Sequence, residues 1–193
     1  MMKNKRKTLI ITMCALFAAL ISVFSQVQIP LPQIPINLAL AAVYLAGVIL
    51  GPAYGSLSVI VFVLLGIVGV PVFAGFRGGL DVITGATGGY IVGYITCAFL
   101  TGLIVKYTSD KIYVVAIAMF LGMVSCYVLG TIWFMTMSGT SLKAALTVCV
   151  LPFLPGDAVK IVLSSVVANR IRHSVEEVYE LNPCRHKCID NIF

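Results

Sequence analysis

The sequence has little charge, and one long stretch has none. Only 10% of its 193 residues are Asp, Glu, Lys or Arg, whereas a soluble domain carries about 25%. From Thr8 to Phe76 there is no acidic residue, no basic residue and no histidine. Because roughly 20 apolar residues cross a bilayer as a helix, this stretch alone holds about three spans. These absences exclude a soluble domain and predict an integral membrane protein.

Catalytic and phosphate-binding motifs are also missing. The two histidines, His173 and His186, lie near the C-terminus, and we find no paired carboxylates and no serine motif with a nearby base. The glycine-rich segment at residues 75–90 lacks the Lys-Ser/Thr pair of a phosphate-binding loop. The sequence therefore predicts a protein that is not an enzyme and has no cofactor or metal of its own.

Proline and glycine divide the apolar sequence into an expected all-α fold of six membrane-spanning helices. The short second and third spans are separated by a turn at Gly51-Pro52, and the prolines at 30, 32 and 35 exclude regular helix between the first two. A cleaved signal peptide over Lys3–Gln26 is the competing interpretation, but the cleavage site and polar mature domain that it requires are missing. The expected spans are Thr8–Gln26, Leu38–Leu50, Tyr54–Val70, Thr87–Val105, Ile112–Met137 and Leu154–Asn169.

The positive charges predict the orientation. Six spans put both ends of the chain on the same side of the membrane. Ten of the 13 Lys and Arg residues lie on that side, at the chain ends or in the tight turns, and only Arg77, Lys143 and Lys160 lie on the other side. The positive-inside rule then places both termini in the cytoplasm, with the protein in the plasma membrane. Topology explains most of the net charge of +6, so we do not expect nucleic-acid binding. Residues 1–172 form the membrane domain and 173–193 a cytoplasmic tail.

The three outward segments, 26–37, 70–86 and 138–153, are long and rich in proline and glycine. Irregular backbone at membrane depth is tolerated where protein buries it or where it lines a cavity. We therefore expect these loops to cover a ligand pocket on the outer face.

Asp157 and Lys160 lie in "LPFLPGDAVKI", where the last span begins. Three residues apart, they share one helix face, and ionisable residues inside a membrane indicate function by default. Two interpretations remain. The residues form only an ion pair, or they bind a ligand that has an amide-like end for the carboxylate and an acidic end for the ammonium.

The outer segment "GFRGGLDVITGATGGY" supplies Gly75, Arg77 and Gly79 as candidate ligand-binding residues. Its glycines permit close approach of the backbone to a ligand or of one helix to another, and both roles stay open. Arg77 is also expected to pair with Asp81 at the loop surface. Tyr90 and Trp133 are either interface-belt aromatics or rings that stack on a ligand.

Small residues and cysteines complete the set of candidates. Ala15 and Ala19 in the first span have the spacing that lets another helix approach, either within the fold or from a partner. Four cysteines at 14, 97, 126 and 149 look like small buried hydrophobes. In the tail, Cys184, His186 and Cys188 form at most a weak metal-binding pattern.

These motifs together resemble the BioY family, the biotin-binding substrate subunits (S components) of energy-coupling-factor (ECF) vitamin transporters. The resemblance covers about residues 8–172. Its most specific parts are "LPFLPGDAVKI" at 151–161, "GATGGYIVGY" at 85–94 and "IPIN" at 34–37.

The resemblance implies a six-helix fold that binds biotin and joins a transmembrane scaffold subunit with two ATP-binding-cassette ATPases, which alone use ATP. It implies that Asp157 accepts from the ureido N–H groups and that Lys160 binds the valerate carboxylate. Asn37 and the Gly75–Tyr90 segment would supply further walls, and Ala15 and Ala19 would face the scaffold. The alternatives are an S component for another vitamin, a secondary transporter of a small organic solute, and a membrane assembly protein without a ligand.

Overall fold

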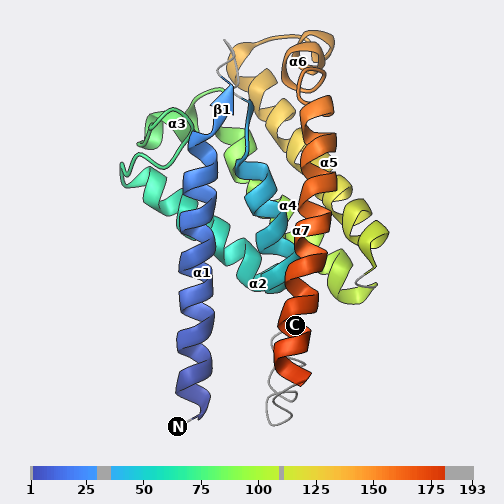
Figure 1. Cartoon of the computed structure of the whole chain (residues 1–193). Coiled ribbons are helices and arrows are strands. Elements are labelled where there is room, and N and C mark those ends of the chain that lie inside the picture. The colour runs from blue at the N-terminus through green and yellow to red at the C-terminus, as the bar shows by residue number, and fades with distance from the viewer. Residues whose placement is uncertain (1, 30–35, 109–110, 181–193) are drawn as a thin grey trace.

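The computed structural model describes residues 2–29, 36–108 and 111–180, and these residues form an almost entirely helical fold. Two short strands, β1 and β2, pair antiparallel through Gln28 with Asn37 and Ile29 with Ile36. Figure 1 shows the order of the elements, which is α1 (Met2–Gln26), β1 (Gln28–Ile29), β2 (Ile36–Asn37), α2 (Ala39–Ile67), α3 (Leu80–Thr84), α4 (Gly88–Tyr107), α5 (Ile112–Ser138), α6 (Leu142–Cys149) and α7 (Leu154–Glu180).

The helices confirm the membrane class but not the count of six spans. In the described part of the chain, four helices are long and apolar enough to cross a bilayer: α1 from Lys7, α2, α4 and α5. The pair formed by α6 and residues 154–171 of α7, bent by 50°, makes a fifth if it counts as one broken span. The count falls to five because the second and third expected spans belong to a single element, α2, and to four if the bent pair that contains the last expected span is left out.

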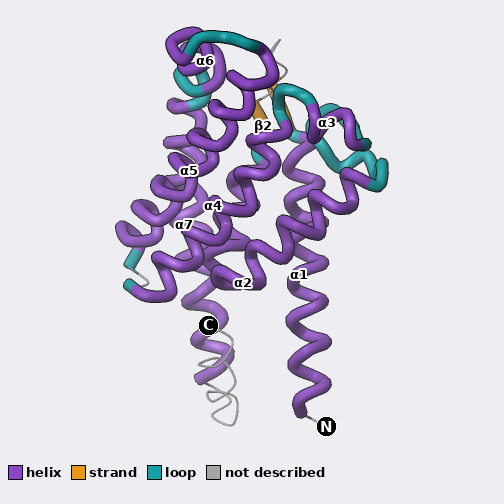
Figure 2. The backbone as a smooth tube through the Cα atoms, turned by 180° about the vertical axis from the view of Figure 1, so that it is seen from behind, coloured by secondary structure: helices purple, strands orange, loops and turns teal. Residues whose placement is uncertain are grey.

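The break in α2 falls where the sequence predicts a turn. Gly51 has φ 75° and ψ −178°, which is not helical, and Pro52 follows it. The two arms of α2 form a V whose tip lies at this break (Figure 1, Figure 2). Each arm has fewer than the roughly 20 residues of a full span.

Three details differ from the sequence-based expectation. The segment 138–153, expected to be irregular, contains the helix α6, whose Ala145 and Cys149 are buried four residues apart on one face. Helix α3 likewise interrupts the glycine-rich loop. Helices α1 and α7 extend past the expected span ends at residues 8 and 169 because hydropathy marks the apolar part of a helix and not its end. The expected domain boundary at residue 172 therefore lies inside α7.

Close approach of backbones positions the centre of the fold. Helix α2 packs against α1, α4 and α7, and α5 packs against α4 and α7. A Cβ atom on Gly47 would lie 2.6 Å from the Ala98 carbonyl oxygen, and one on Gly102 would lie 2.6 Å from the Pro52 nitrogen. Small residues at these crossings let α2 and α4 touch, as is usual for helices in membranes.

The two ends of the molecule differ. The start of α1 and the end of α7 extend from the same end, and the strands, α3 and α6 gather at the opposite end (Figure 1, Figure 2). The expected irregular segments thus lie together, and they surround the beginnings of α2, α4 and α7.

Candidate functional site

The first turns of α7 bury an acid and a base side by side. Pro155 is compatible with the first turn because the amide hydrogen that it lacks would have no helical partner there. Asp157 is 2% exposed and Lys160 is 7% exposed. The Lys160 ammonium donates to the Asp157 Oδ1 atom at 2.7 Å, and the Tyr127 hydroxyl of α5 donates to Oδ2. Both carboxylate oxygens therefore have a donor.

A cavity of about 40 Å³ adjoins this pair. Its wall joins the start of α2, the first half of α4, the middle of α5 and the start of α7. The residues that line it are Asn37, Leu40, Tyr90, Tyr94, Cys126, Tyr127, Phe153, Asp157 and Lys160. The charged pair is thus buried beside a small cavity.

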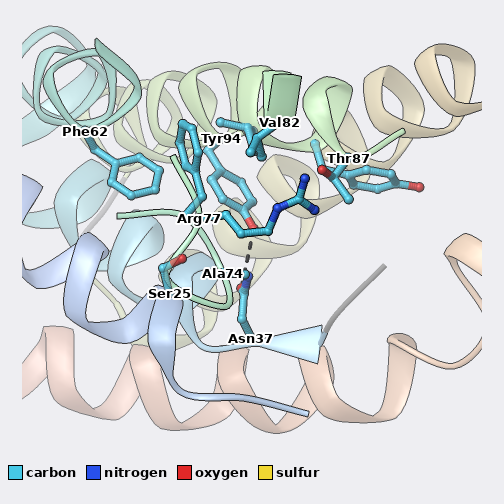
Figure 3. A pocket seen from close by; sticks show the side chains of 11 residues that line it. Ser25, Asn37, Phe62, Ala74, Arg77, Val82, Thr87 and Tyr94 are labelled. Atoms are coloured by element: carbon cyan, nitrogen blue, oxygen red, sulfur yellow. Dashed lines mark hydrogen bonds between the residues drawn. The ribbon is translucent and has the colours of Figure 1, made fainter. Parts of the chain in front are cut away.

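A second cavity of about 80 Å³ shares Asn37, Tyr90 and Tyr94 with the first. Figure 3 shows its lining residues, with Arg77 and Thr87 on one side and Ser25 and Phe62 on the other. Together the two cavities lead from the 71–77 loop to the Asp157–Lys160 pair.

Asn37 stands where the two cavities meet. As the last residue of β2 it precedes α2, and its Oδ1 atom accepts from the Ala39 amide at 3.2 Å. The same atom accepts from the Tyr94 hydroxyl at 3.5 Å, the dashed contact in Figure 3. These bonds fix the amide group between α2 and α4.

The glycine-rich loop contributes one charged side chain to the larger cavity. Arg77 lines it and also pairs with Asp81 at 3.3 Å, which confirms the expected surface ion pair. Gly75 has φ 76° and Gly79 has φ 111°, conformations that suit glycine. Neither glycine is among the residues that line these two cavities.

The two candidate aromatics lie in different places. Tyr90 lines both cavities, its hydroxyl is 3.3 Å from the Thr131 hydroxyl, and its ring meets the edge of Tyr127 at 6.5 Å. Trp133 donates through Nε1 to the Gly85 carbonyl at 3.0 Å and packs where Gly89 leaves room. In the described structure it ties α5 to the start of α4 and borders neither cavity.

Ala15 and Ala19 are not brought to this site. Both are exposed on α1, whereas Ala18 between them is buried against the core. The small-residue pair thus faces away from the fold. The four cysteines at 14, 97, 126 and 149 are buried and free, as expected. Cys184, His186 and Cys188 lie outside the described residues.

Sequence reasoning missed two site residues, Tyr127 and Cys126, and one buried tyrosine, Tyr44. Tyr127 touches Asp157 and Cys126 lines the smaller cavity. The Tyr44 side chain is fully buried, and its hydroxyl has no hydrogen-bond partner within the described residues. Tyrosine in membrane proteins is enriched at the two interfaces, so a tyrosine in the middle of a span was the available signal.

Comparison with known proteins identifies the family. The model of the BioY family matches residues 2–177. The chain belongs to the BioY family.

BioY relatives match nearly their whole length. The probable biotin transporter BioY of Pyrococcus horikoshii is 35% identical over 84% of this chain and 95% of its own. The biotin transporter BioY of Thermotoga maritima is 37% identical over 81% and 92%. The crystal structure of the S-component for biotin from an ECF-type ABC transporter matches with a TM-score of 0.82 and 32% identity, covering 88% of this chain and 94% of that one.

Proposed function

We propose that this protein is the biotin-binding S component of an ECF transporter. Membership of the BioY family and the likeness to a biotin S-component support this function. The observation that carries it is the Asp157–Lys160 pair, buried beside the smaller of two neighbouring cavities. A carboxylate accepts from the N–H donors of a ligand and an ammonium binds its carboxylate, so the pair matches the two kinds of polar group that biotin carries.

When biotin binds, Asp157 and Lys160 exchange their hydrogen bond to each other for hydrogen bonds to the ligand. The ureido N–H groups of biotin donate to Asp157, and Lys160 leaves Oδ1 to bind the valerate carboxylate. Each buried charge keeps a hydrogen-bonded partner throughout, which matters because an unpaired buried charge is strongly destabilising. The carboxylate adds one negative charge to the site, and Arg77, which lines the larger cavity, is the further cation that would offset it.

Other candidate residues shape the site. Asn37 and Tyr90 contact the ligand, since each lines both cavities. Gly75 and Gly79 act through the conformation of the loop, and Trp133 acts by holding Gly85 at the start of α4. The outer loops cover the bound biotin.

The arms of α2 cross the membrane as separate, short spans, which gives six crossings of the plasma membrane with cytoplasmic termini. The chain joins a transmembrane scaffold subunit and two ATP-binding-cassette ATPases, which hydrolyse the ATP. This chain has no catalytic role and needs no cofactor. The exposed pair Ala15 and Ala19 faces the scaffold.

Titration of the purified chain with biotin and a panel of other vitamins tests this function. We expect biotin to bind, and Asp157→Asn and Lys160→Ala each to weaken binding by about tenfold or more, because a hydrogen bond to a charged group contributes about 1.5–3 kcal/mol. Lys143→Ala, which removes an exposed lysine from α6, is the control and should bind normally.

Three results would contradict the proposal. Unchanged biotin affinity in both variants would exclude the assigned residues. Retention of a different vitamin would indicate an S component of other specificity. Uptake by vesicles that depends on an ion gradient, without partner subunits, would indicate a secondary transporter.

A further inference from the structure

The side chain of Gln26, the last residue of α1, engages a loop about fifty residues away in sequence. Its Nε2 atom lies 3.4, 3.1 and 3.2 Å from the carbonyl oxygens of Pro71, Val72 and Phe73. Its Oε1 atom accepts from the Phe76 amide at 2.9 Å. We call this set of contacts the Gln26 clamp. The two Nε2 hydrogens are shared among these carbonyls and the Ser22 carbonyl of α1 at 3.3 Å, so one side chain ties residues 71–76 to α1.

The loop held by this clamp is a wall of the larger cavity. Phe73, Ala74 and Arg77 all line that cavity. Phe73 is 2% exposed and meets the edge of the Phe62 ring at 5.5 Å. Its backbone pairs with Arg77 at 2.9 and 3.3 Å. The position of this segment therefore decides the shape of the cavity.

The same loop contains a strained residue. Phe76 has φ 56°, and in the described part of the chain it alone has a positive φ without being glycine. A bulky residue in this region is an outlier, which persists only when its surroundings fix it. Its ring is 73% exposed, so core packing does not fix it. Two features hold it: the hydrogen bond from its amide to Gln26 and the Phe73–Arg77 backbone pairing that encloses it.

We propose that Gln26 is a positioning residue of the ligand site, which holds the 71–77 loop in its strained conformation and so sets how long the ligand stays bound. This inference rests on the proposed function. It adds that the wall of the site is tied to α1, the helix that presents Ala15 and Ala19 outward. A partner that shifts α1 would therefore loosen the wall.

Gln26→Leu tests the clamp, because leucine is of similar size and can neither donate nor accept. Two measurements on the full chain are informative: hydrogen exchange of residues 71–77 without biotin, and the rate of biotin dissociation. We expect faster exchange and a dissociation rate raised about tenfold or more, since several hydrogen bonds are lost together. The control is Ser22→Ala, one turn earlier, whose hydroxyl donates to the Ala18 carbonyl of its own helix.

A second substitution separates the clamp from a general loss of structure. Phe76→Gly removes the strain, because glycine adopts positive φ at no steric cost. In this background Gln26→Leu should raise the dissociation rate by a smaller factor than in the parent chain. An equal factor in both backgrounds, or unchanged exchange in Gln26→Leu, would overturn the proposal. Hydrogen exchange needs no ligand, so it tests the Gln26 clamp even if the parent chain does not bind biotin. Failure of the parent chain to bind biotin would contradict the proposed function and not the clamp.

Discussion

Asp157 is the residue at the centre of the candidate ligand site. It is almost fully buried, and its two oxygens accept from a neutral donor, Tyr127, and from a cation, Lys160. A buried ion pair often adds little to stability, whereas removing one partner leaves a charge without compensation. Such a pair is therefore better explained by binding than by folding.

Two tyrosines near this carboxylate allow a matched test of what a buried hydroxyl contributes. Tyr127→Phe removes the donor to Asp157, so we expect unfolding stability to fall by about 1.5–3 kcal/mol. Tyr44→Phe removes a buried hydroxyl that has no partner within the described residues. It should leave stability unchanged or raise it, because an unsatisfied buried polar group is costly. Thermal unfolding of both variants in the same lipid or detergent measures the difference.

The comparison is controlled because each variant loses one oxygen atom from a buried tyrosine. Equal losses of stability would contradict the prediction, since they would mean that the Tyr44 hydroxyl is as well bonded as that of Tyr127.

The charged residues of the site could be predicted from the sequence, whereas its tyrosine and cysteine could not. Asp157 and Lys160 stand out in an apolar sequence because ionisable groups in a membrane are costly. Tyr127 and Cys126 carry a weaker signal, because a tyrosine in the middle of a span is only unusual and a buried thiol packs as a small hydrophobe. Their role depends on contacts between α5 and α7, which the sequence of either helix does not contain.

At the scale of elements, the crossing of α2 and α4 limits what the fold tolerates. Gly47 lies against Ala98, and Gly102 lies against Gly47 and Pro52 next to the break in α2. The backbones are in contact there, so no side chain can move aside to accept a larger residue. The V of α2 depends on this contact as well as on the conformation of Gly51.

Gly102→Ala should therefore destabilise the protein although alanine is the better helix former. The new methyl group would lie 2.6 Å from the Pro52 nitrogen and 2.7 Å from the Gly47 oxygen. Overpacking of this kind costs about 1–3 kcal/mol. Gly156→Ala in α7 is the matched control, because a Cβ atom there meets nothing within 4 Å. It should be neutral or stabilising by up to about 1 kcal/mol, and the apparent melting temperatures of the two variants measure the contrast.

The contrary result is a Gly102→Ala variant that melts no lower than Gly156→Ala. It would show that α2 and α4 can separate at little cost.

Runs of apolar residues correctly predicted the long helices, but they did not predict the short helices. The positions of α4 and α5 follow from runs of about 20 apolar residues between glycine-rich or charged turns. Helices α3 and α6 have five and eight residues, which is too few for periodicity to separate them from a loop. The strands β1 and β2 are two residues each, and their pairing depends on how the ends of α1 and α2 meet.

At the scale of the whole molecule, binding and docking are assigned to different surfaces. The two cavities lie among α2, α3, α4, α5, α7, the 71–77 loop and Ser25 near the end of α1, whereas Ala15 and Ala19 lie on the outward face of α1. Ser25 and Gln26 at the end of α1 connect that helix to the cavity wall. Substitutions on α1 should therefore separate the two activities.

Replacing both Ala15 and Ala19 by leucine should spare biotin binding and impair assembly. The substitutions leave the buried Ala18 and the clamp intact, so the affinity of the isolated chain for biotin should not change. In a close helix contact the added side chains cost about 1–3 kcal/mol, so we expect the affinity for the scaffold subunit to fall by about tenfold or more. Co-purification with the scaffold and ATPases, beside a biotin titration of the same preparation, measures both.

Ala144→Leu, at an exposed alanine on α6, is the control and should change neither biotin affinity nor assembly. Undiminished co-purification of the double variant would reject this face of α1 as the docking surface.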